Sequence, residues 1–589
     1  MRIHLFLATA AIALLLGLLA VPSTPVRAQP VPVPVPVAPA DPVESGPKTI
    51  RLPLGPGEVS LDPHRCPSGT SLRLIGDLYE GLTQWLPGET PMLAPCLSKD
   101  WPIVSADGLT YTFKLRTEAR FHNSICFEGS KGRALKSSDV VASFKRMAAT
   151  SSEETNWFWL IKGLIAGLDE YAEKAAASGG FAGSDDTEIE GLSAPDDETF
   201  VMKLTRPFGP IMAVLAHPAC SIIAAEAMNY YSSELERRAV GTAPFRLNAV
   251  LAGRLYVLKR IEDYWGEKPD FERVTYGEPG SIEDFMSGEW AHFDLNQTLY
   301  RRYVRDGKLV GQLAKCKAEF NAFDDLGTYF TAFNMSDPIF GALDADGRGL
   351  RKAIAFCIDR TRMVEGWFGS TSFGRPANEL FPPGCEFYEL GKSDDWGSYD
   401  LKQAKAALDA TKYKGGLDPA TGAALTVTLY GNAGAGNERM RDVIKAGLGQ
   451  LGINLEAKLL APDLLTAAMD SGEGQMYLSG WFLDYPDAQN ILQLYDSRNV
   501  GTGEENRNVA RYESKEFDEG YAELLKLALK PENLAKRREV AGKLAGRLLE
   551  DRPIVPLMVR RYASVRSNTV NWPKVPQSSF DETRFIKSK

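Results

Sequence analysis

The segment Gly480-Trp481-Phe482-Leu483-Asp484-Tyr485-Pro486-Asp487 places one carboxylate, that of Asp484, inside an apolar and aromatic run. A carboxylate in such surroundings must be paired or solvated, because burying it alone costs free energy. The ammonium group of a bound ligand would be such a partner. The alternative is that Asp-Tyr-Pro-Asp forms a β-turn in which Asp484 is a turn residue. Trp481 is either a pocket wall or part of the core.

The rest of the chain mixes strand and helix patterns, which predicts a mixed α/β class. Residues 110–115 and 200–204 alternate apolar and polar side chains after acidic turns, so we expect them to be paired strands of one sheet. Ser137-Ser138-Asp139 predicts the start of a helix over 140–147. Residues 350–359 have helical spacing, with a core-facing stripe of Leu350, Ile354 and Cys357. Other segments have helical spacing or are short apolar runs typical of strands. We expect helices over 402–410, 437–451, 519–530 and 533–549, and strands over 425–430 and 554–559.

The first residues have the features of an export signal. Arg2 supplies a positive charge, an apolar run follows over 5–21, and Val26-Arg27-Ala28 has the small-x-small form of a cleavage site. We expect cleavage after Ala28. An uncleaved membrane anchor is the alternative, although this run is at the short edge of the spanning range of roughly 17–25 residues. Residues 29–47 are rich in proline and predict an extended tether, either a spacer or a ligand for an aromatic groove.

Length and composition indicate a globular protein and argue against some classes of partner. The chain has 589 residues, of which 44% are hydrophobic and 24% charged, so it is globular and too long for one hydrophobic core. Its 67 basic and 76 acidic residues give a net charge of -9, without a long basic block. Nucleic acid is therefore a poor partner.

Motifs of exported hydrolases, Gly-x-Ser-x-Gly and His-Glu-x-x-His, are missing from the sequence. The histidines after the signal have contexts that favour structural roles: His64, His122, His217 and His292. Seven cysteines have no metal-ligand spacing, and export permits disulfides whose pairing the sequence does not reveal: Cys66, Cys96, Cys126, Cys220, Cys316, Cys357 and Cys385. The glycine-rich segment 431–437 lacks the Lys-Ser/Thr ending of a phosphate loop. We expect no catalytic residue, no metal and no cofactor.

Several phrases follow one another along the chain in a characteristic order. They are Ser60-Leu61-Asp62-Pro63-His64, Leu78-Tyr79-Glu80-Gly81-Leu82, residues 107–116 and 138–146, Val240-Gly241-Thr242-Ala243-Pro244-Phe245, Phe333-Asn334, Ile358-Asp359-Arg360, and residues 480–487 and 508–512. Together they resemble the periplasmic solute-binding proteins of peptide ABC importers, the oligopeptide- and dipeptide-binding family (solute-binding family 5). The resemblance spans roughly residues 49–585.

The resemblance implies an α/β, three-lobed periplasmic binding protein fold (type II, cluster C-like) with the ligand enclosed between two lobes. After a signal peptide (1–28) and a Pro-rich linker (29–47), we expect three lobes. They are a discontinuous lobe I (48–82, 205–326 and 555–589), lobe II (83–204) and lobe III (327–554).

The same resemblance implies a binding site. Members of the family hold an extended peptide through its main chain as an added strand, and Gly480 and Phe482 match the strand edge. The acid of the Gly-Trp-x-x-Asp phrase pairs with the peptide's α-ammonium, and Asp484 matches it. Trp481 and Tyr485 complete the expected ligand-binding set.

The chain departs from its tripeptide-binding relatives in one respect. Those proteins place arginines just upstream of the Gly-Trp phrase to meet the ligand carboxylate, whereas residues 467–478 contain no cation. The carboxylate is then met elsewhere or by water, or the ligand is longer, modified or not a peptide.

The function implied is that of a monomeric, periplasmic substrate-binding component of an ABC importer. Such a protein captures a peptide or other small solute by hinge closure and delivers it to a permease and ATPase complex. Binding of a nickel chelate, haem or sugar by the same fold remains an alternative, as does a sensory or chaperone-like role. An exported hydrolase would need catalytic groups assembled from distant positions.

Overall fold

A computed structural model describes residues 48–88, 92–150, 156–178, 186–501, 506–574 and 582–589. The expected signal peptide and Pro-rich linker lie outside these residues. In the part of the chain described, none of the helices has the length and apolar character needed to cross a membrane.

Two four-stranded sheets lie in the N-terminal half of the described chain. The first has the order β1 (Thr49–Pro53), β10 (Arg273–Gly277), β9 (Leu255–Arg260), β8 (Phe245–Leu251), and β1 runs parallel to β10. The second has the order β4 (Ile103–Val104), β5 (Thr110–Lys114), β7 (Thr199–Lys203), β6 (Leu192–Asp196). The first sheet therefore joins segments more than 200 residues apart in the sequence.

The strand pair predicted from alternation is confirmed. β5 and β7 pair antiparallel, with Phe113 opposite Phe200 and Tyr111 opposite Met202. All four of these side chains are buried, while the intervening residues are more exposed. Because each strand has one buried apolar face and one more exposed face, apolar and polar residues alternate along its sequence.

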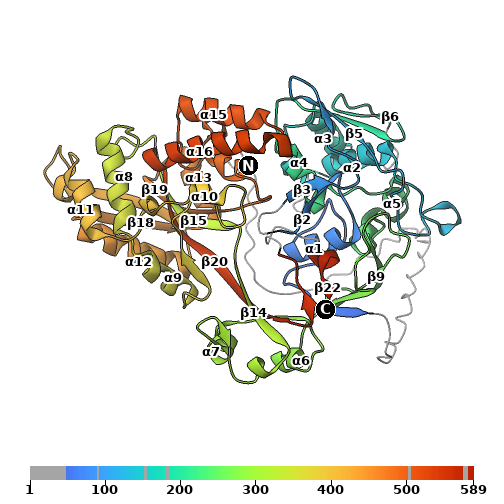
Figure 1. Cartoon of the computed structure of the whole chain (residues 1–589). Coiled ribbons are helices and arrows are strands. Elements are labelled where there is room, and N and C mark those ends of the chain that lie inside the picture. The colour runs from blue at the N-terminus through green and yellow to red at the C-terminus, as the bar shows by residue number, and fades with distance from the viewer. Residues whose placement is uncertain (1–47, 89–91, 151–155, 179–185, 502–505, 575–581) are drawn as a thin grey trace, which may run out of the picture. The chain divides into compact units, whose positions relative to one another are not determined.

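The largest sheet has the order β11 (His292–Asp294), β20 (Ile554–Ser567), β15 (Gly327–Phe333), β19 (Met476–Phe482), β17 (Thr426–Asn432), β18 (Asn454–Leu460). β14 (Ala318–Asp324) and β16 (Gly374–Pro376) also pair with β20. Figure 1 shows β20 as a long red strand that runs from β15 towards β14. The strand expected over 554–559 is therefore only the first part of a 14-residue strand.

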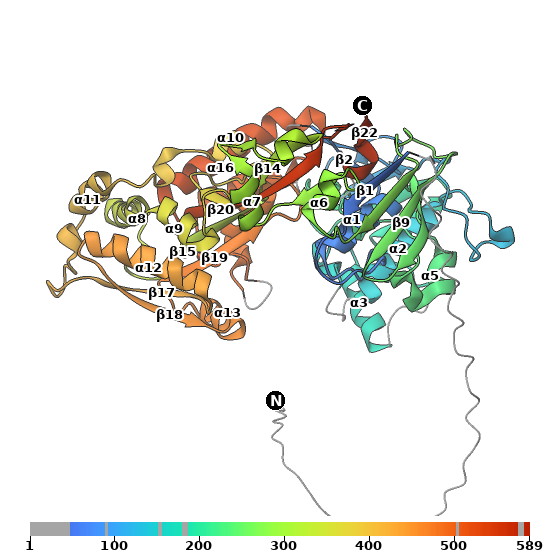
Figure 2. The ribbon, with the colours of Figure 1, turned by 90° about the horizontal axis from the view of Figure 1, so that it is seen from below.

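Helices lie where the sequence predicted them, with shifted ends. They are α8 (Ala345–Cys357), α11 (Leu401–Asp409), α12 (Ala435–Gln450), α15 (Lys515–Lys526) and α16 (Leu534–Asp551). The stripe of Leu350, Ile354 and Cys357 on α8 is fully buried, as expected. α12 and α13 (Pro462–Ser471) pack against β17 and β18, which Figure 2 shows in orange.

Two helix ends differ from expectation for local reasons. α2 (Ser137–Ala149) begins three residues earlier than predicted, because Asp139 Oδ2 accepts a hydrogen bond from the backbone N–H of Lys136 and closes the first turn. α15 ends four residues early. The N–H of Gly209 donates to the Leu525 carbonyl (2.6 Å), and the N–H of Leu529 donates to the Gly209 carbonyl (3.1 Å). The segment around Gly209 therefore supplies hydrogen bonds where α15 would otherwise continue for another turn.

The remaining elements are short or peripheral to the site. The helices are α1 (Gly69–Leu78), α3 (Leu168–Ala177), α4 (Ile211–Val214), α5 (Ala225–Tyr231), α6 (Ile282–Met286), α7 (Gln297–Tyr303), α9 (Arg360–Phe368), α10 (Tyr388–Gly391) and α14 (Gln489–Leu492). The strands are β2 (Thr83–Leu86), β3 (Met92–Pro95), β12 (Val304–Arg305), β13 (Lys308–Leu309), β21 (Val570–Asn571) and β22 (Lys587–Ser588). The predicted lobe boundaries stay a prediction.

The histidines and cysteines behave as structural groups. Burial lowers the pKa of His64 to about 3, of His122 to about 4 and of His217 to about 3, so these rings are neutral at pH 7. All seven cysteines are free thiols, so none of the disulfides that export would permit is formed. The Cys66 thiol instead points at the Pro63 carbonyl (3.5 Å). The described residues contain no cluster of three or more potential metal ligands.

Candidate functional site

Asp484 lies in the loop that joins β19 to α14. The loop bends over 484–486, and a three-residue turn stands where the sequence suggested a β-turn: the N–H of Asp487 donates to the Tyr485 carbonyl (2.8 Å), and Asp487 Oδ1 accepts from the N–H of Gln489 (2.7 Å). Asp487 also forms a buried ion pair with Arg537 of α16 (2.5 Å). The loop is therefore anchored one turn beyond Asp484, and Asp484 itself is not the residue that closes the turn.

The carboxylate of Asp484 is oriented by an amide. Asn490 Nδ2 donates to Asp484 Oδ2 at 3.1 Å, while Asn490 Oδ1 accepts from the indole Nε1 of Trp481 at 2.8 Å. Because the indole N–H can only donate, it determines which end of the amide faces the acid. Trp481 thus acts on Asp484 through Asn490.

No cation within 4.0 Å pairs with Asp484 among the described residues. Desolvation by burial raises the pKa of its carboxyl to about 6, although the bond from Asn490 and the charge of Arg507 act in the opposite direction. A half-buried carboxylate with one neutral donor is incompletely satisfied. A ligand cation at this position would stabilise the ionised form.

A pocket of about 560 Å³, part of which is open to solvent, lies against Asp484. Four stretches of chain meet there: residues 159–164, residues 206–208, the loop and helices over 484–499, and Arg507 with Tyr521 of α15. The Gly209–Leu525 and Gly209–Leu529 hydrogen bonds hold the second stretch against α15.

Part of the pocket lining is aromatic and neutral. Tyr485 donates its hydroxyl to Gln489 Oε1 (2.6 Å), and Gln489 Nε2 donates to the hydroxyl of Tyr521 (2.8 Å). Burial raises the pKa of both tyrosines above the ordinary value, so they remain protonated. Tyr485 contributes a fixed wall rather than a charge.

Cations also line the pocket. Arg507 donates from Nη1 to Gln493 Oε1 (3.0 Å), and Arg206 and Lys162 also line the pocket. The second acid of the pocket, Asp496, is already bound by Arg498 through two nitrogens (2.9 and 2.7 Å). The pocket therefore presents positive and negative groups to one space.

β19 has an open edge next to this loop. Within the described chain, β17 pairs with β19 only at Leu429–Met476 and Tyr430–Tyr477. β15 pairs with the whole of β19 on the other side. The later residues of β19 therefore offer one edge to an additional strand.

Hydrogen-bond alternation shows which groups face that edge. The N–H of Leu483 donates to the Leu326 carbonyl of the segment preceding β15 (2.8 Å). In an antiparallel pair every second residue bonds to the partner strand, so Trp481 points its backbone groups at β15. Gly480 and Phe482 then point theirs away from β15. These are the two residues expected to form the strand edge.

The structure thus brings only part of the predicted set into the pocket. Asp484 and Tyr485 line it, whereas Gly480, Trp481 and Phe482 lie on β19 and are not among its lining residues. The sequence reasoning missed three groups, Asn490, Arg206 and Arg507. The missing cation in 467–478 indicated that any carboxylate must be met elsewhere, but nothing local marked Arg206 or Arg507.

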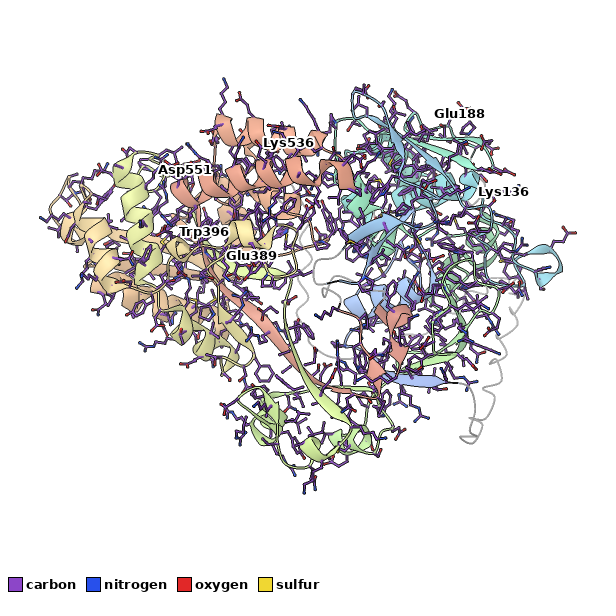
Figure 3. The ribbon with its side chains drawn as sticks, viewed as in Figure 1. Lys136, Glu188, Glu389, Trp396, Lys536 and Asp551 are labelled. Carbon is purple, nitrogen blue, oxygen red and sulfur yellow. The ribbon has the colours of Figure 1, made fainter. Side chains whose placement is uncertain are left out.

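Hydrogen bonds attach the segment that follows Arg507, residues 508–512, to neighbouring parts of the chain. The side chain of Asn508 donates to the carbonyls of Asp496 (3.1 Å) and Tyr512 (2.9 Å). The hydroxyl of Tyr512 donates to the buried Asp551 (2.7 Å). Figure 3 labels Lys536 and Asp551, which lie towards opposite ends of α16. The segment that carries Arg507 is therefore attached to the C-terminal end of α16, at Asp551.

Comparisons with known proteins show which family the chain belongs to. The family model of bacterial extracellular solute-binding proteins, family 5 middle, matches residues 93–502. The chain is 25% identical over 573 residues to di/tripeptide-binding protein 2 of Pseudomonas aeruginosa, covering 92% of this chain and 95% of that protein. It is 26% identical over 450 residues to the dipeptide-binding protein of Escherichia coli, covering 75% and 77%.

The fold is shared with solved structures. HbpA2 from Haemophilus parasuis superposes with a TM-score of 0.74 at 18% identity, covering 92% of this chain and all of that one. The predicted α/β periplasmic binding protein fold is thereby confirmed. Since the family model spans well over half of the sequence, the chain belongs to the bacterial extracellular solute-binding proteins of family 5.

Proposed function

We propose that this protein is the extracytoplasmic substrate-binding component of an ABC importer and that it captures peptides with a free α-amino group. One observation carries the proposal: the Asp484 carboxylate, oriented by Asn490, lines a pocket and has no cation within 4.0 Å among the described residues. The names of the relatives, a di/tripeptide-binding and a dipeptide-binding protein, support peptides as the ligand class.

The α-ammonium of the peptide supplies the missing charge. A charge-assisted hydrogen bond contributes about 1.5–3 kcal/mol, so the Asp484 contact is worth about tenfold to more than a hundredfold in affinity. The peptide backbone adds to the open edge of β19 through Gly480 and Phe482, which gives affinity without selecting side chains.

The protein performs no bond chemistry in this proposal. Ligand binds the closed arrangement more tightly than the open one, and this difference in affinity drives hinge closure. The closed protein is presented to a membrane permease with ATPase subunits. A monomer in the periplasm, exported by the signal over residues 1–28, suits that role.

The direct test is native mass spectrometry of the mature protein purified from its own exported fraction, followed by denaturation and identification of released molecules. Co-purified peptides of mixed sequence with free amino termini are expected. A single non-peptide solute, such as a metal chelate, haem or sugar, would retain the fold and overturn the ligand class.

A further inference from the structure

A strongly basic stretch of the chain, residues 297–317, contributes no residue to the pocket beside Asp484. It carries six cations and one acid, although the whole chain has a net charge of -9. All six cations are exposed: Arg301, Arg302, Arg305, Lys308, Lys315 and Lys317. We propose that this basic segment docks the protein on a membrane surface of anionic phospholipid headgroups. The proposal goes beyond the substrate-binding role and does not depend on which ligand occupies the pocket.

The centre of the basic segment is a helix followed by a tight hairpin. α7 ends at Tyr303, and β12 then pairs antiparallel with β13, so that Arg305 stands directly opposite Lys308. The two turn residues, Asp306 and Gly307, have positive φ angles of 49° and 69°, as a two-residue turn of this kind requires. The register of the hairpin therefore fixes Arg305 and Lys308 as neighbours.

The cations are crowded although crowding costs stability. Like charges that lie directly opposite each other on paired strands repel. A third cation is close, because the carbonyl of Arg301 accepts a hydrogen bond from Arg305 Nη1. No ion pair joins Arg301, Arg305 or Lys308 to an acid of the described chain, and this includes Asp306 in the turn. An external anion would relieve this repulsion.

Three acids near the basic segment in the sequence have other neighbours. Glu289 pairs with Arg51 (2.5 Å), and Asp294 bonds to His292 (2.9 Å). Glu319, which follows the segment, lies in β14 opposite Arg566. The segment therefore presents its net positive charge to solvent on an otherwise acidic protein.

The surface of the basic segment lacks the apolar centre of a specific protein interface. Its apolar side chains pack inward, since Leu299, Tyr303 and Leu309 join a core cluster with Phe285 and Val565. None of its large apolar side chains is exposed, and all of its residues are described. Protein interfaces bury apolar and aromatic side chains at their centre, whereas adsorption to anionic headgroups needs only clustered Lys and Arg. The composition of this surface therefore favours headgroups over an acidic protein.

The charge distribution of the protein also gives the adsorption a direction. An anionic surface attracts the basic segment and repels the acidic remainder of the protein, so the segment turns towards the membrane. The attraction acts over about one Debye length, which is about 10 Å at 0.1 M salt and about 3 Å at 1 M. Docking is therefore reversible and sensitive to salt.

Co-sedimentation of the full mature chain with vesicles, without added peptide, tests the proposal. Vesicles of phosphatidylcholine with about one quarter phosphatidylglycerol are compared with pure phosphatidylcholine vesicles at about 50 mM salt. We expect binding to the anionic vesicles to be about tenfold stronger or more, and to be lost at about 500 mM salt.

The triple variant Arg301→Gln, Lys308→Gln, Lys317→Gln assigns the binding to the basic segment. These side chains are exposed and form no ion pair or hydrogen bond with described residues, so folding should be unaffected. Each cation near an anionic surface contributes about fivefold, so the variant should bind the anionic vesicles at least about tenfold more weakly than wild type. If its melting temperature falls, the double variant Lys308→Gln, Lys315→Gln carries the test.

The matched control removes the same charge from another surface. Lys402→Gln, Lys405→Gln, Lys445→Gln changes three exposed lysines of α11 and α12 and should bind the anionic vesicles as wild type does. Peptide affinity, measured in parallel by calorimetry, should be the same in all three proteins. A failure of the docking proposal is thereby distinguished from a failure of the proposed function.

Three results overturn the inference. The first is wild-type binding that does not distinguish anionic from neutral vesicles. The second is an equal loss of binding in the triple variant and in the matched control. The third is binding to native membranes while protein-free anionic vesicles remain inert, which would assign the basic segment to an acidic protein loop in place of lipid.

Discussion

Asn490 holds Asp484 by a 3.1 Å hydrogen bond from its amide nitrogen, and the orientation of that amide is determined by the indole of Trp481. The carboxylate that we assign to the ligand ammonium is thus positioned by two side chains that need not touch the ligand. Such support gives a binding group a defined direction before the ligand arrives.

Asn490→Ala tests this positioning. The substitution frees the Asp484 carboxylate and leaves the Trp481 indole N–H without its acceptor. We expect peptide affinity to fall about tenfold and unfolding free energy to fall by about 1–3 kcal/mol. Calorimetry and urea unfolding measure the two effects. Asn321→Ala, which removes an amide bonded to Ser564 outside the pocket, is the control and should leave affinity unchanged. Unaltered affinity in Asn490→Ala would contradict the positioning role.

Affinity should depend on pH through Asp484. Burial raises the pKa of this carboxyl to about 6 in the free protein, and only its ionised form attracts an ammonium. A bound ammonium lowers that pKa, so affinity rises with pH up to about 6 and levels off above it. Asp484→Asn should flatten this profile. A wild-type profile that is equally flat would show that Asp484 does not meet the ligand.

The contribution of Asp484 to the stability of the unliganded protein should fall with rising pH, whereas its contribution to affinity rises. Its folded pKa is above the ordinary value of 3.8, so the folded state binds more protons than the unfolded state between pH 3.8 and 6. The contribution of Asp484 is fully present below pH 3.8 and is lost as the pH rises through 6. Comparison of wild type with Asp484→Asn by chemical denaturation at several pH values isolates it. A difference that stays constant with pH would contradict the raised pKa.

The loop that carries Asp484 depends on a buried cluster of charges. Arg537 pairs with Asp487 (2.5 Å) and Glu386 (3.3 Å), and burial beside Asp487 raises the pKa of Glu386 to about 8. Arg537→Met leaves two acids without a cation and is expected to cost about 3–5 kcal/mol of unfolding free energy. Lys543→Met, which removes an exposed pair with Glu539, should leave the midpoint unchanged. Equal midpoints for the two variants would show that the buried cluster is unimportant.

The open edge of β19 gives a separate prediction. Phe482→Pro removes the N–H that points away from β15, whereas Phe482→Ala keeps it and removes the same ring. If the peptide adds as a strand, Phe482→Pro should weaken binding of all peptides severalfold more than Phe482→Ala. Calorimetry with trialanine measures both. The same loss in both variants would indicate a side-chain contact in place of strand addition.

Local patterns predicted the elements whose two faces differ. β5 and β7 alternate, and α8 has a buried stripe at Leu350, Ile354 and Cys357, because each buries one face and exposes the other. The second half of β20 was missed. Its partners β11 and β14 lie more than 200 residues away in the sequence, so no local signal marks where it ends.

The part of the site that lies within one short sequence motif could be predicted, whereas the parts contributed by distant segments could not. Asp484 stood out as an acid in an apolar run, within one short motif. Arg206 lies three residues before Gly209, which bonds to Leu525 of α15. Arg507 adjoins Asn508, whose side chain bonds to the carbonyls of Asp496 and Tyr512. These contacts depend on tertiary packing, so the cationic side of the pocket could not be predicted from sequence spacing.

The central claim, that Asp484 receives a peptide α-ammonium, is tested most directly by calorimetry of wild type and Asp484→Asn with one peptide in free-amine and N-acetylated forms. The account predicts that Asp484→Asn weakens binding of the free-amine peptide by about tenfold to more than a hundredfold and leaves the affinity for the acetylated peptide nearly unchanged. Equal losses for both peptides, or no loss for either, would contradict it.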